Sequence, residues 1–319
     1  MRLIVYLPIL LPLLATATAK PLAARLDPRA ATWLLTLAAV GLAAASTIAL
    51  GLLTLTAVIR IPLVASLGHW SRSVLGRDNP ATTVVAVAAG VLLAGAVLAV
   101  GYFAVHRYRS LADAFRHARA LPGAGTGDLV VIDDPAADAY ALPGRPGRIV
   151  VSQNMLDALD EGGRAVLLAH ERAHLAGFHY VFTTVARLAA TANPLLRPVA
   201  EAVEFTVERW ADERAAQEVG DRRQVARTIA AAAIAAKNDP PRHRLAAALG
   251  IGPARGSALA GAGPVPRRVA ALLAPPPARR AVLLLAMTAV VAVAGLCSME
   301  AARDLHGLLE QANTLHPGR

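Results

Sequence analysis

Five consecutive residues, His170-Glu171-Arg172-Ala173-His174, combine side chains that can bind a metal with one that can move a proton. The flanking residues favour a helix, and on a helix two residues four apart project from the same face. His170 and His174 can therefore offer two imidazole nitrogens to one zinc ion. Glu171 is too offset to share the metal, but it can take a proton from water there. This H-E-x-x-H motif predicts a zinc-dependent hydrolase.

A catalytic zinc needs a third protein ligand. One class of zinc peptidase continues the motif as H-E-x-x-H-x-x-G-x-x-H. Here Gly177 stands at the glycine position, but Tyr180 occupies the final position and His179 comes one residue early. This class is therefore disfavoured, and we expect the third ligand to be a carboxylate on a later helix.

The segment 198–216 carries the carboxylates that could complete the site. Glu204, Glu208 and Asp212 are spaced by four and share one helical face. Spacing alone permits any of the three.

The residues Glu208-Arg209-Trp210-Ala211-Asp212 read E-x-x-A-D. The combination of H-E-x-x-H with a later E-x-x-A-D resembles the gluzincin membrane peptidases, which include the HtpX and CaaX-prenyl-protease type and the BlaR/MecR type of antirepressor peptidase. Four further segments are similar in order and spacing to the BlaR/MecR type: Ala141-Leu142-Pro143-Gly144, Ile149-Val150-Val151-Ser152, Leu156-Asp157-Ala158-Leu159 and Arg267-Arg268-Val269-Ala270-Ala271-Leu272. The resemblance covers about residues 128–273 and the placement of the membrane spans.

This resemblance implies that Glu208 is the third zinc ligand and that Asp212 orients a ligand histidine. It also implies cleavage of a protein or peptide substrate, such as a cytoplasmic repressor in signal transduction. The chain departs from the β-lactam-sensing members of the family. After Cys297 there is no room for a penicillin-binding domain and no S-x-x-K motif. We therefore expect no such sensor domain and no antibiotic sensing.

Two other functions remain open. An HtpX-like or CaaX-protease-like quality-control peptidase would use the same metal ligands, although the sequence of Ala141–Gly144 favours the antirepressor type. A non-catalytic membrane receptor could keep zinc for structure alone, but such a site would have no need of Glu171.

Two further site features are predicted less directly. Tyr140, Ala141 and Leu142 form a short extended segment, which we expect to offer a sheet edge along which substrate lies. No side chain is identifiable as the donor to the oxyanion, and the candidates are His179, Tyr180 and Arg209.

The composition is that of a membrane protein, with 55% hydrophobic residues and a mean hydropathy of +0.48. We expect membrane-spanning helices at residues 3–19, 31–59, 81–105 and 281–298, followed by a polar tail at 299–319. The first run could instead be a cleaved signal peptide, but the basic residues Lys20 and Arg25 follow it, and this charge order favours a span.

Charge and cysteine content exclude other classes. The net charge is +10, but the arginines are scattered between apolar runs and form no basic face interleaved with aromatic residues, so we expect no direct binding of nucleic acid. Cys297 is the only cysteine, which excludes an intrachain disulfide and a cysteine zinc site.

Positive residues follow the third apolar run, from His106 to Arg119. Because cytoplasmic loops carry an excess of Lys and Arg, we expect a multi-pass protein of the cell membrane whose active-site domain is cytoplasmic. The positive loop at 60–78 would then lie outside, against this rule.

The region 106–280 is predicted to be the zinc metallopeptidase domain. Extended segments are expected at 129–132, 140–142 and 149–151. Residues 182–192 are expected to form a soluble helix, resting at the membrane surface. The predicted fold is a mainly α membrane protein, with an α+β zincin-like domain inserted between the third and fourth spans.

Overall fold

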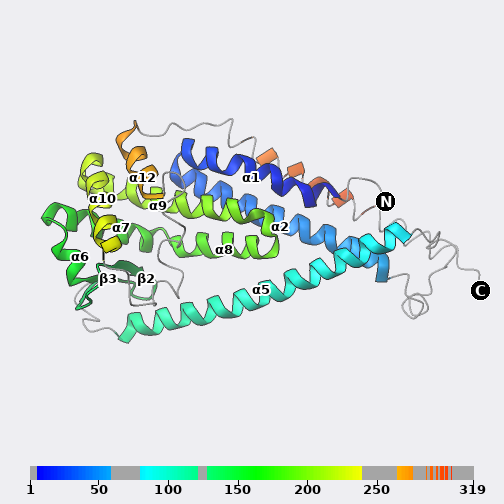
Figure 1. The fold of residues 1–319 in the computed structure, drawn as a ribbon, viewed down its shortest axis with the longest axis horizontal. Coiled ribbons are helices and arrows are strands. Elements are labelled where there is room, and N and C mark those ends of the chain that lie inside the picture. The colour runs from blue at the N-terminus through cyan, green and yellow to red at the C-terminus, as the bar shows by residue number, and fades with distance from the viewer. Residues whose placement is uncertain are drawn as a thin grey trace, which may run out of the picture.

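The computed structural model describes residues 6–58, 80–120, 128–238 and 264–275, together with isolated residues between 285 and 303. Its elements in chain order are α1 (Leu7–Arg25), α2 (Pro28–Val58), α5 (Pro80–Ala120), β1 (Leu129–Ile132), β2 (Ala139–Leu142), β3 (Arg148–Ser152), α6 (Gln153–Asp157), α7 (Glu161–Ala176), α8 (His179–Ala192), the 3₁₀ turn η2 (Pro194–Leu196), α9 (Arg197–Val219), α10 (Arg222–Asn238) and α12 (Pro264–Leu273) (Figure 1).

Three helices are long and apolar enough to cross a membrane, at Leu7–Arg25, Pro28–Leu55 and Thr83–His117. They overlap the first three predicted spans and indicate a membrane protein. The predicted fourth span, 281–298, and the tail, 299–319, fall largely outside the described residues.

The third span does not end where the apolar run ends. The sequence indicated a stop at Val105, but α5 continues as one helix through the basic residues to Ala120. Charged residues such as Arg107 and Arg109 are good helix formers, so they change the helix's surroundings without breaking it. The end of an apolar run therefore marks the expected edge of the lipid, not the end of the helix.

One apolar core joins the N-terminal helices to two helices from the predicted soluble region. It contains fully buried residues from α1, α2, α8 and α9, among them Ala19, Leu42, Ala186 and Val203. In Figure 1, α8 lies between α2 and α5, and α9 lies along α2. The predicted helix at 182–192 is thus α8, which begins earlier, at His179, and packs against α2 and α5.

The three predicted extended segments form one mixed sheet in the order β1-β3-β2. β1 pairs with β3 in parallel, and β2 pairs with β3 in the antiparallel sense, so β2 is an edge strand. Ile149 and Val151 of the central strand pack in one buried cluster with Leu167 of α7. This cluster fixes the position of α7 relative to the sheet.

The ends of α7 and α9 have clear local causes. Asp160 caps α7 by accepting a hydrogen bond from the backbone N–H of Gly163 at 2.7 Å. α9 stops at Gly220, which adopts a left-handed conformation with φ 80°. Val166 of α7 packs in one buried cluster with Ala215 of α9, which holds the two helices side by side.

Candidate metal centre

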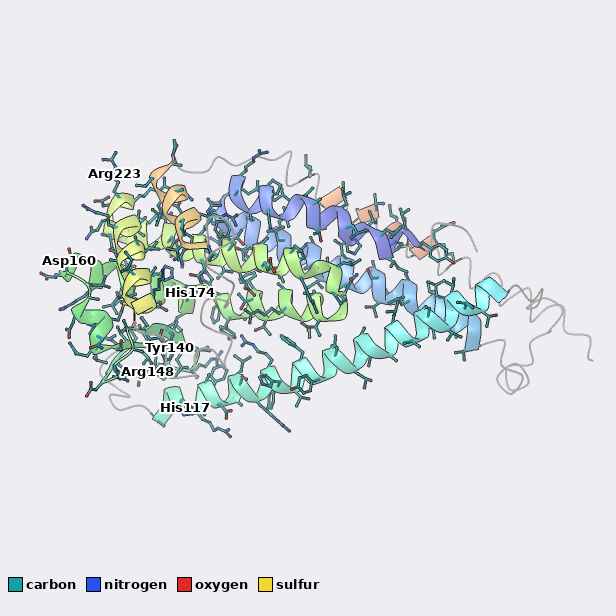
Figure 2. The ribbon with its side chains drawn as sticks, in the orientation of Figure 1. His117, Tyr140, Arg148, Asp160, His174 and Arg223 are labelled. Atoms are coloured by element: carbon teal, nitrogen blue, oxygen red, sulfur yellow. The ribbon has the colours of Figure 1, made fainter. Side chains whose placement is uncertain are left out.

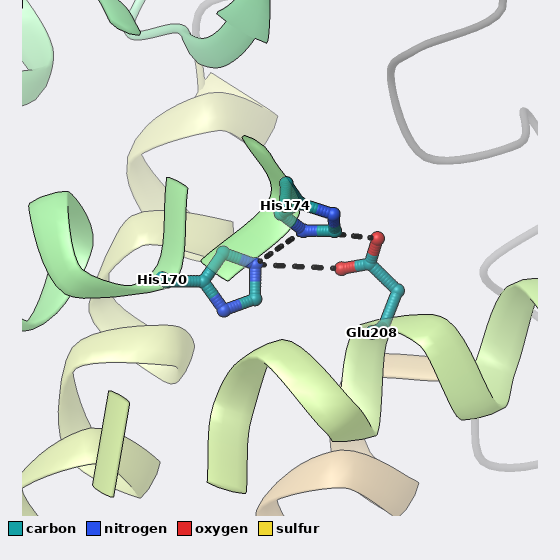
Figure 3. Close-up of side chains that lie close together, drawn as sticks. All are labelled: His170, His174 and Glu208. Carbon is teal, nitrogen blue, oxygen red and sulfur yellow. Dashed lines mark hydrogen bonds and ion pairs between the residues drawn. The ribbon is translucent and has the colours of Figure 1, made fainter. Parts of the chain in front are cut away.

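His170 and His174, on α7, and Glu208, on α9, bring their ligand atoms to one point (Figure 3). The Nε2 atoms of the two histidines are 3.1 Å apart. Glu208 places one carboxylate oxygen 3.6 Å from His170 Nε2 and the other 3.6 Å from His174 Nε2. All three side chains are largely removed from solvent. The histidines share a face because they are four residues apart, and the packing of α7 on α9 supplies the carboxylate.

This arrangement fits a tetrahedral metal such as zinc. Ligand atoms about 2.0–2.1 Å from zinc at tetrahedral angles lie about 3.3–3.4 Å from one another, close to the separations observed. Burial lowers the pKa of His174 to about 4, so its imidazole is neutral, as a metal ligand must be. Burial alone would raise the pKa of Glu208, but the nearby charge of Arg268 holds it below its usual value and keeps the carboxylate ionised.

Glu204 does not join this cluster, although it lies one turn before Glu208 on α9. Its carboxylate accepts a hydrogen bond from Arg187 Nε of α8 at 2.5 Å. Glu208 therefore faces the two histidines, whereas Glu204 faces α8.

Asp212 lies on the other side of His170 from the metal position. Its Oδ1 is 3.1 Å from His170 Nδ1, and it is 1% exposed. Arg268 of α12 donates to both oxygens of this carboxylate, from Nε at 2.8 Å and from Nη2 at 2.6 Å. Arg268 Nη1 also lies 2.9 Å from Glu208 Oε2. One buried guanidinium thus holds the ligand Glu208 and the residue that orients His170.

His179 has the corresponding place behind His174. Its Nδ1 lies 3.0 Å from His174 Nδ1, and it is 2% exposed. For His174 Nε2 to bind a metal, the proton must be on Nδ1, which then donates to His179 Nδ1. The other nitrogen of His179, Nε2, has no hydrogen-bond partner among the described residues, and the ring packs against Trp210 at 4.6 Å between centroids.

The chain reversal after α7 makes this contact possible. Phe178 adopts a left-handed conformation with φ 49°, and α8 starts at once with His179. A Cβ atom on Gly177 would lie 2.3 Å from His179 Nε2. Glycine is therefore needed at this position so that His179 can fold back onto the metal helix.

Glu171 is buried beside the ligand cluster, with 7% exposure. Burial raises its pKa to about 7, with the negative charge of Glu208 adding to the effect. Its carboxylate accepts a hydrogen bond from the backbone N–H of Ala141 in β2. A carboxyl group that exchanges its proton near neutral pH beside a metal position is suited to general base catalysis.

The edge strand β2 lies at the same end of the molecule as this cluster, where Figure 2 labels Tyr140 and His174. The backbone N–H of Ser152 donates to the carbonyl of Asp138, so these two residues form a hydrogen-bonded pair. Along an antiparallel ladder, hydrogen-bonded pairs alternate with pairs whose N–H and C=O groups point away from each other. Tyr140 therefore bonds to β3, whereas Ala141 directs its N–H and C=O away from β3. The hydrogen bond to Glu171 shows that this free edge faces the candidate catalytic carboxylate.

The three candidate oxyanion donors lie in different places. His179 contacts His174 on the side of the imidazole that faces away from the metal position. Arg209 donates to the carbonyl of Ala23 at 2.5 Å and so binds the end of α1. The ring of Tyr180 lies 6.5 Å from that of Phe178, and no contact of Tyr180 with the ligand cluster is seen among the described residues.

Two residues of this centre were not predicted as site residues. Arg268 belongs to the segment Arg267–Leu272 that resembles the BlaR/MecR type, but the sequence does not show which of the two adjacent arginines contacts the site. His179 was considered as a third metal ligand and as an oxyanion donor, but not as a partner of His174. Its spacing of five from His174 places it just past the helix, and this was the one available signal.

Comparison with known proteins agrees with this chemistry. The model of peptidase family M48 matches residues 107–189, which include His170, Glu171 and His174 but not Glu208. The match supports a metallopeptidase, and M48 metallopeptidases depend on a metal, typically zinc. No curated protein and no solved structure matches the chain. This match does not distinguish the BlaR/MecR type from other metallopeptidases.

Proposed function

We propose that this chain is a membrane zinc endopeptidase. His170, His174 and Glu208 would hold the zinc ion, whose chemistry is to polarise a peptide carbonyl and to make water at the site more acidic. The observation that carries the proposal is the convergence of these three ligand side chains beside the buried carboxyl group of Glu171.

Glu171 is the general base in this proposal. It takes a proton from the water that attacks the scissile carbonyl carbon. When the C–N bond breaks, Glu171 gives that proton to the leaving nitrogen. A buried carboxyl group beside the metal position can accept a proton and return it within one reaction cycle.

The remaining residues position the ligands. Asp212 orients His170, His179 orients His174, and Arg268 holds both Asp212 and Glu208. Such partners fix the tautomer and direction of each ligand. The edge of β2 that is not paired with β3, where the carbonyl of Ala141 points outward, is suited to bind substrate in extended form through main-chain hydrogen bonds.

Replacing Glu171 with Gln tests catalysis separately from metal binding. We expect the variant to keep its zinc and lose proteolysis, because the amide cannot accept the proton. Glu161→Gln, on the same helix but in its first turn, is the matched control and should leave both unchanged. Full activity in Glu171→Gln would remove Glu171 as the general base, whereas zinc-loaded wild type without proteolysis would favour a zinc ion held for structure alone.

We propose a cytoplasmic repressor protein as substrate, with the active-site domain in the cytoplasm. The order and spacing of motifs between residues 128 and 273 support this choice, as does the basic cluster after Val105. The alternative is a quality-control peptidase that degrades membrane proteins. Comparing the proteomes of cells with the wild type and with Glu171→Gln separates the two. A soluble DNA-binding protein that stays intact only in the variant supports the repressor, whereas accumulating membrane proteins support quality control.

A further inference from the structure

α8, η2 and α9 form a helical hairpin that lies along the N-terminal spans, not on the sheet. Its tip, Asn193–Leu196, makes contacts far from the turn between α1 and α2. Asn193 Nδ2 donates to Ser46 Oγ of α2 at 3.0 Å, and Thr16 Oγ1 of α1 donates to the carbonyl of Leu195 at 2.7 Å. At its other end, the hairpin places Arg209 at the last carbonyls of α1.

These contacts locate the tip along the spans. Ser46 is 18 residues after Pro28, the first residue of α2, which corresponds to about 27 Å of helix. Thr16 is nine residues before Arg25, the last residue of α1, or about 13 Å. The hydrocarbon layer of a bilayer is about 30 Å thick. If α1 and α2 cross it, the tip of the hairpin lies inside it.

The polar groups of the tip are bonded within the protein. Asn193 N–H donates to the carbonyl of Ala189, and Leu196 N–H donates to the carbonyl of Asn193. The Asn193 side chain accepts from Leu195 N–H at 3.1 Å. A turn in water can leave such groups to solvent, whereas a turn in lipid needs internal partners. Pro194 removes one further donor from the turn.

Polar side chains between the tip of the hairpin and the metal centre are also paired. Arg187 of α8 and Glu204 of α9 form an ion pair between the two helices. Arg107 of α5 donates from Nε to Thr184 Oγ1 of α8 at 2.9 Å. Ionisable groups within a membrane region pair in this way with one another or with polar neighbours.

Two exposed charges limit how far the hairpin can enter. Arg197 directly follows the tip and Glu201 lies one turn later on the same face of α9, and both are exposed. The long side chain of Arg197 must therefore extend to the headgroups, which sets the depth of the tip. α8 has 14 residues and is about 21 Å long, too short to cross the bilayer. Both features fit a segment that enters and leaves on the same side.

We propose that the α8–α9 hairpin is a re-entrant membrane element, whose tip at Asn193–Leu196 enters the hydrocarbon of the bilayer beside α1 and α2. The hairpin begins five residues after the ligand His174 and carries the ligand Glu208. The metal centre is thereby tied to the membrane surface. This inference depends on the spans and not on catalysis.

Single cysteines in a Cys297→Ser background test the proposal through their reaction with a membrane-impermeant maleimide. The test position is Leu195, which is 40% exposed in the structure. Val131 of β1, 46% exposed, is the control for water, and Val97 of α5, 60% exposed, is the control for lipid. Labelling is measured in membranes opened on both sides, and each value is divided by labelling after denaturation in SDS. Zinc content checks that each variant is folded.

We expect Leu195→Cys and Val97→Cys to label about tenfold less than Val131→Cys, because apolar surroundings suppress the reactive thiolate. Labelling of Leu195→Cys at the level of Val131→Cys, with Val97→Cys protected, would overturn the re-entrant hairpin alone. If Val97→Cys also labelled fully, both the hairpin and the membrane assignment of α5 would be wrong. Neither result bears on whether the chain is a peptidase.

Discussion

His179 Nδ1 lies 3.0 Å from His174 Nδ1, on the side of the imidazole that faces away from the metal position. The two residues belong to different helices, and Gly177 and Phe178 form the reversal between them. This contact gives His174 a partner that fixes its ring, as Asp212 does for His170.

His179→Phe should weaken zinc binding about 10–100-fold, as loss of a partner behind a ligand typically does. Phenylalanine keeps a ring against Trp210 but cannot accept a hydrogen bond. His179→Asn places an acceptor near the same position and should recover much of the affinity. The measurement is a zinc titration of metal-free protein against a competing chelator. Equal affinity in wild type and His179→Phe would remove His179 from the site.

Arg268→Met should destabilise the metal-free protein, because it leaves Glu208 and Asp212 as two buried negative charges. Breaking a buried ion pair by removing one partner typically costs about 3–5 kcal/mol. Arg267→Met is the control, since Arg267 lies over the ring of Phe205 at 4.1 Å and touches neither carboxylate in the contacts described. Melting in detergent measures the difference. Equal melting temperatures for the two variants would contradict the role assigned to Arg268.

Glu208→Gln should abolish proteolysis and weaken zinc strongly, because an amide is a poorer ligand than a carboxylate. Glu204→Gln should change zinc binding little, since Glu204 pairs with Arg187. Metal analysis of the two purified variants compares them directly. Loss of zinc from Glu204→Gln with retention in Glu208→Gln would mean that the ligand is assigned one helical turn too late.

Reporter fusions test the membrane orientation. A fusion after Gly127 should behave as cytoplasmic, because the basic residues from His106 to Arg119 precede it. A fusion at Arg319, beyond the predicted fourth span, should behave as external. The reverse pattern would place the metal centre outside and exclude a cytoplasmic repressor as substrate.

Much of the ligand geometry could be predicted because it is local. Four residues separate His170 from His174, and helical spacing puts such residues on one face. The strands were recognisable from short apolar runs between turn residues, and their positions are confirmed. The choice of Glu208 over Glu204 needed more than spacing. The E-x-x-A-D resemblance supplied it, and the structure places Glu208 at the histidines.

What could not be predicted depends on packing between distant segments. Arg268 meets Asp212 across 56 residues of chain, and no periodic pattern links them. The expectation that α8 is a soluble helix rested on Arg187, and the sequence did not show that the partner of this charge is Glu204 of another helix. From the sequence alone, a charge that is paired in the fold cannot be distinguished from one that faces solvent.

The zinc content of the purified protein tests the central claim most directly. Detergent-purified wild type should hold about one zinc ion per chain, by the logic of three protein ligands and one open position. The double variant His170→Ala, His174→Ala should hold none under the same conditions. One zinc ion per chain in the double variant would contradict the metal centre, and with it the peptidase built on it.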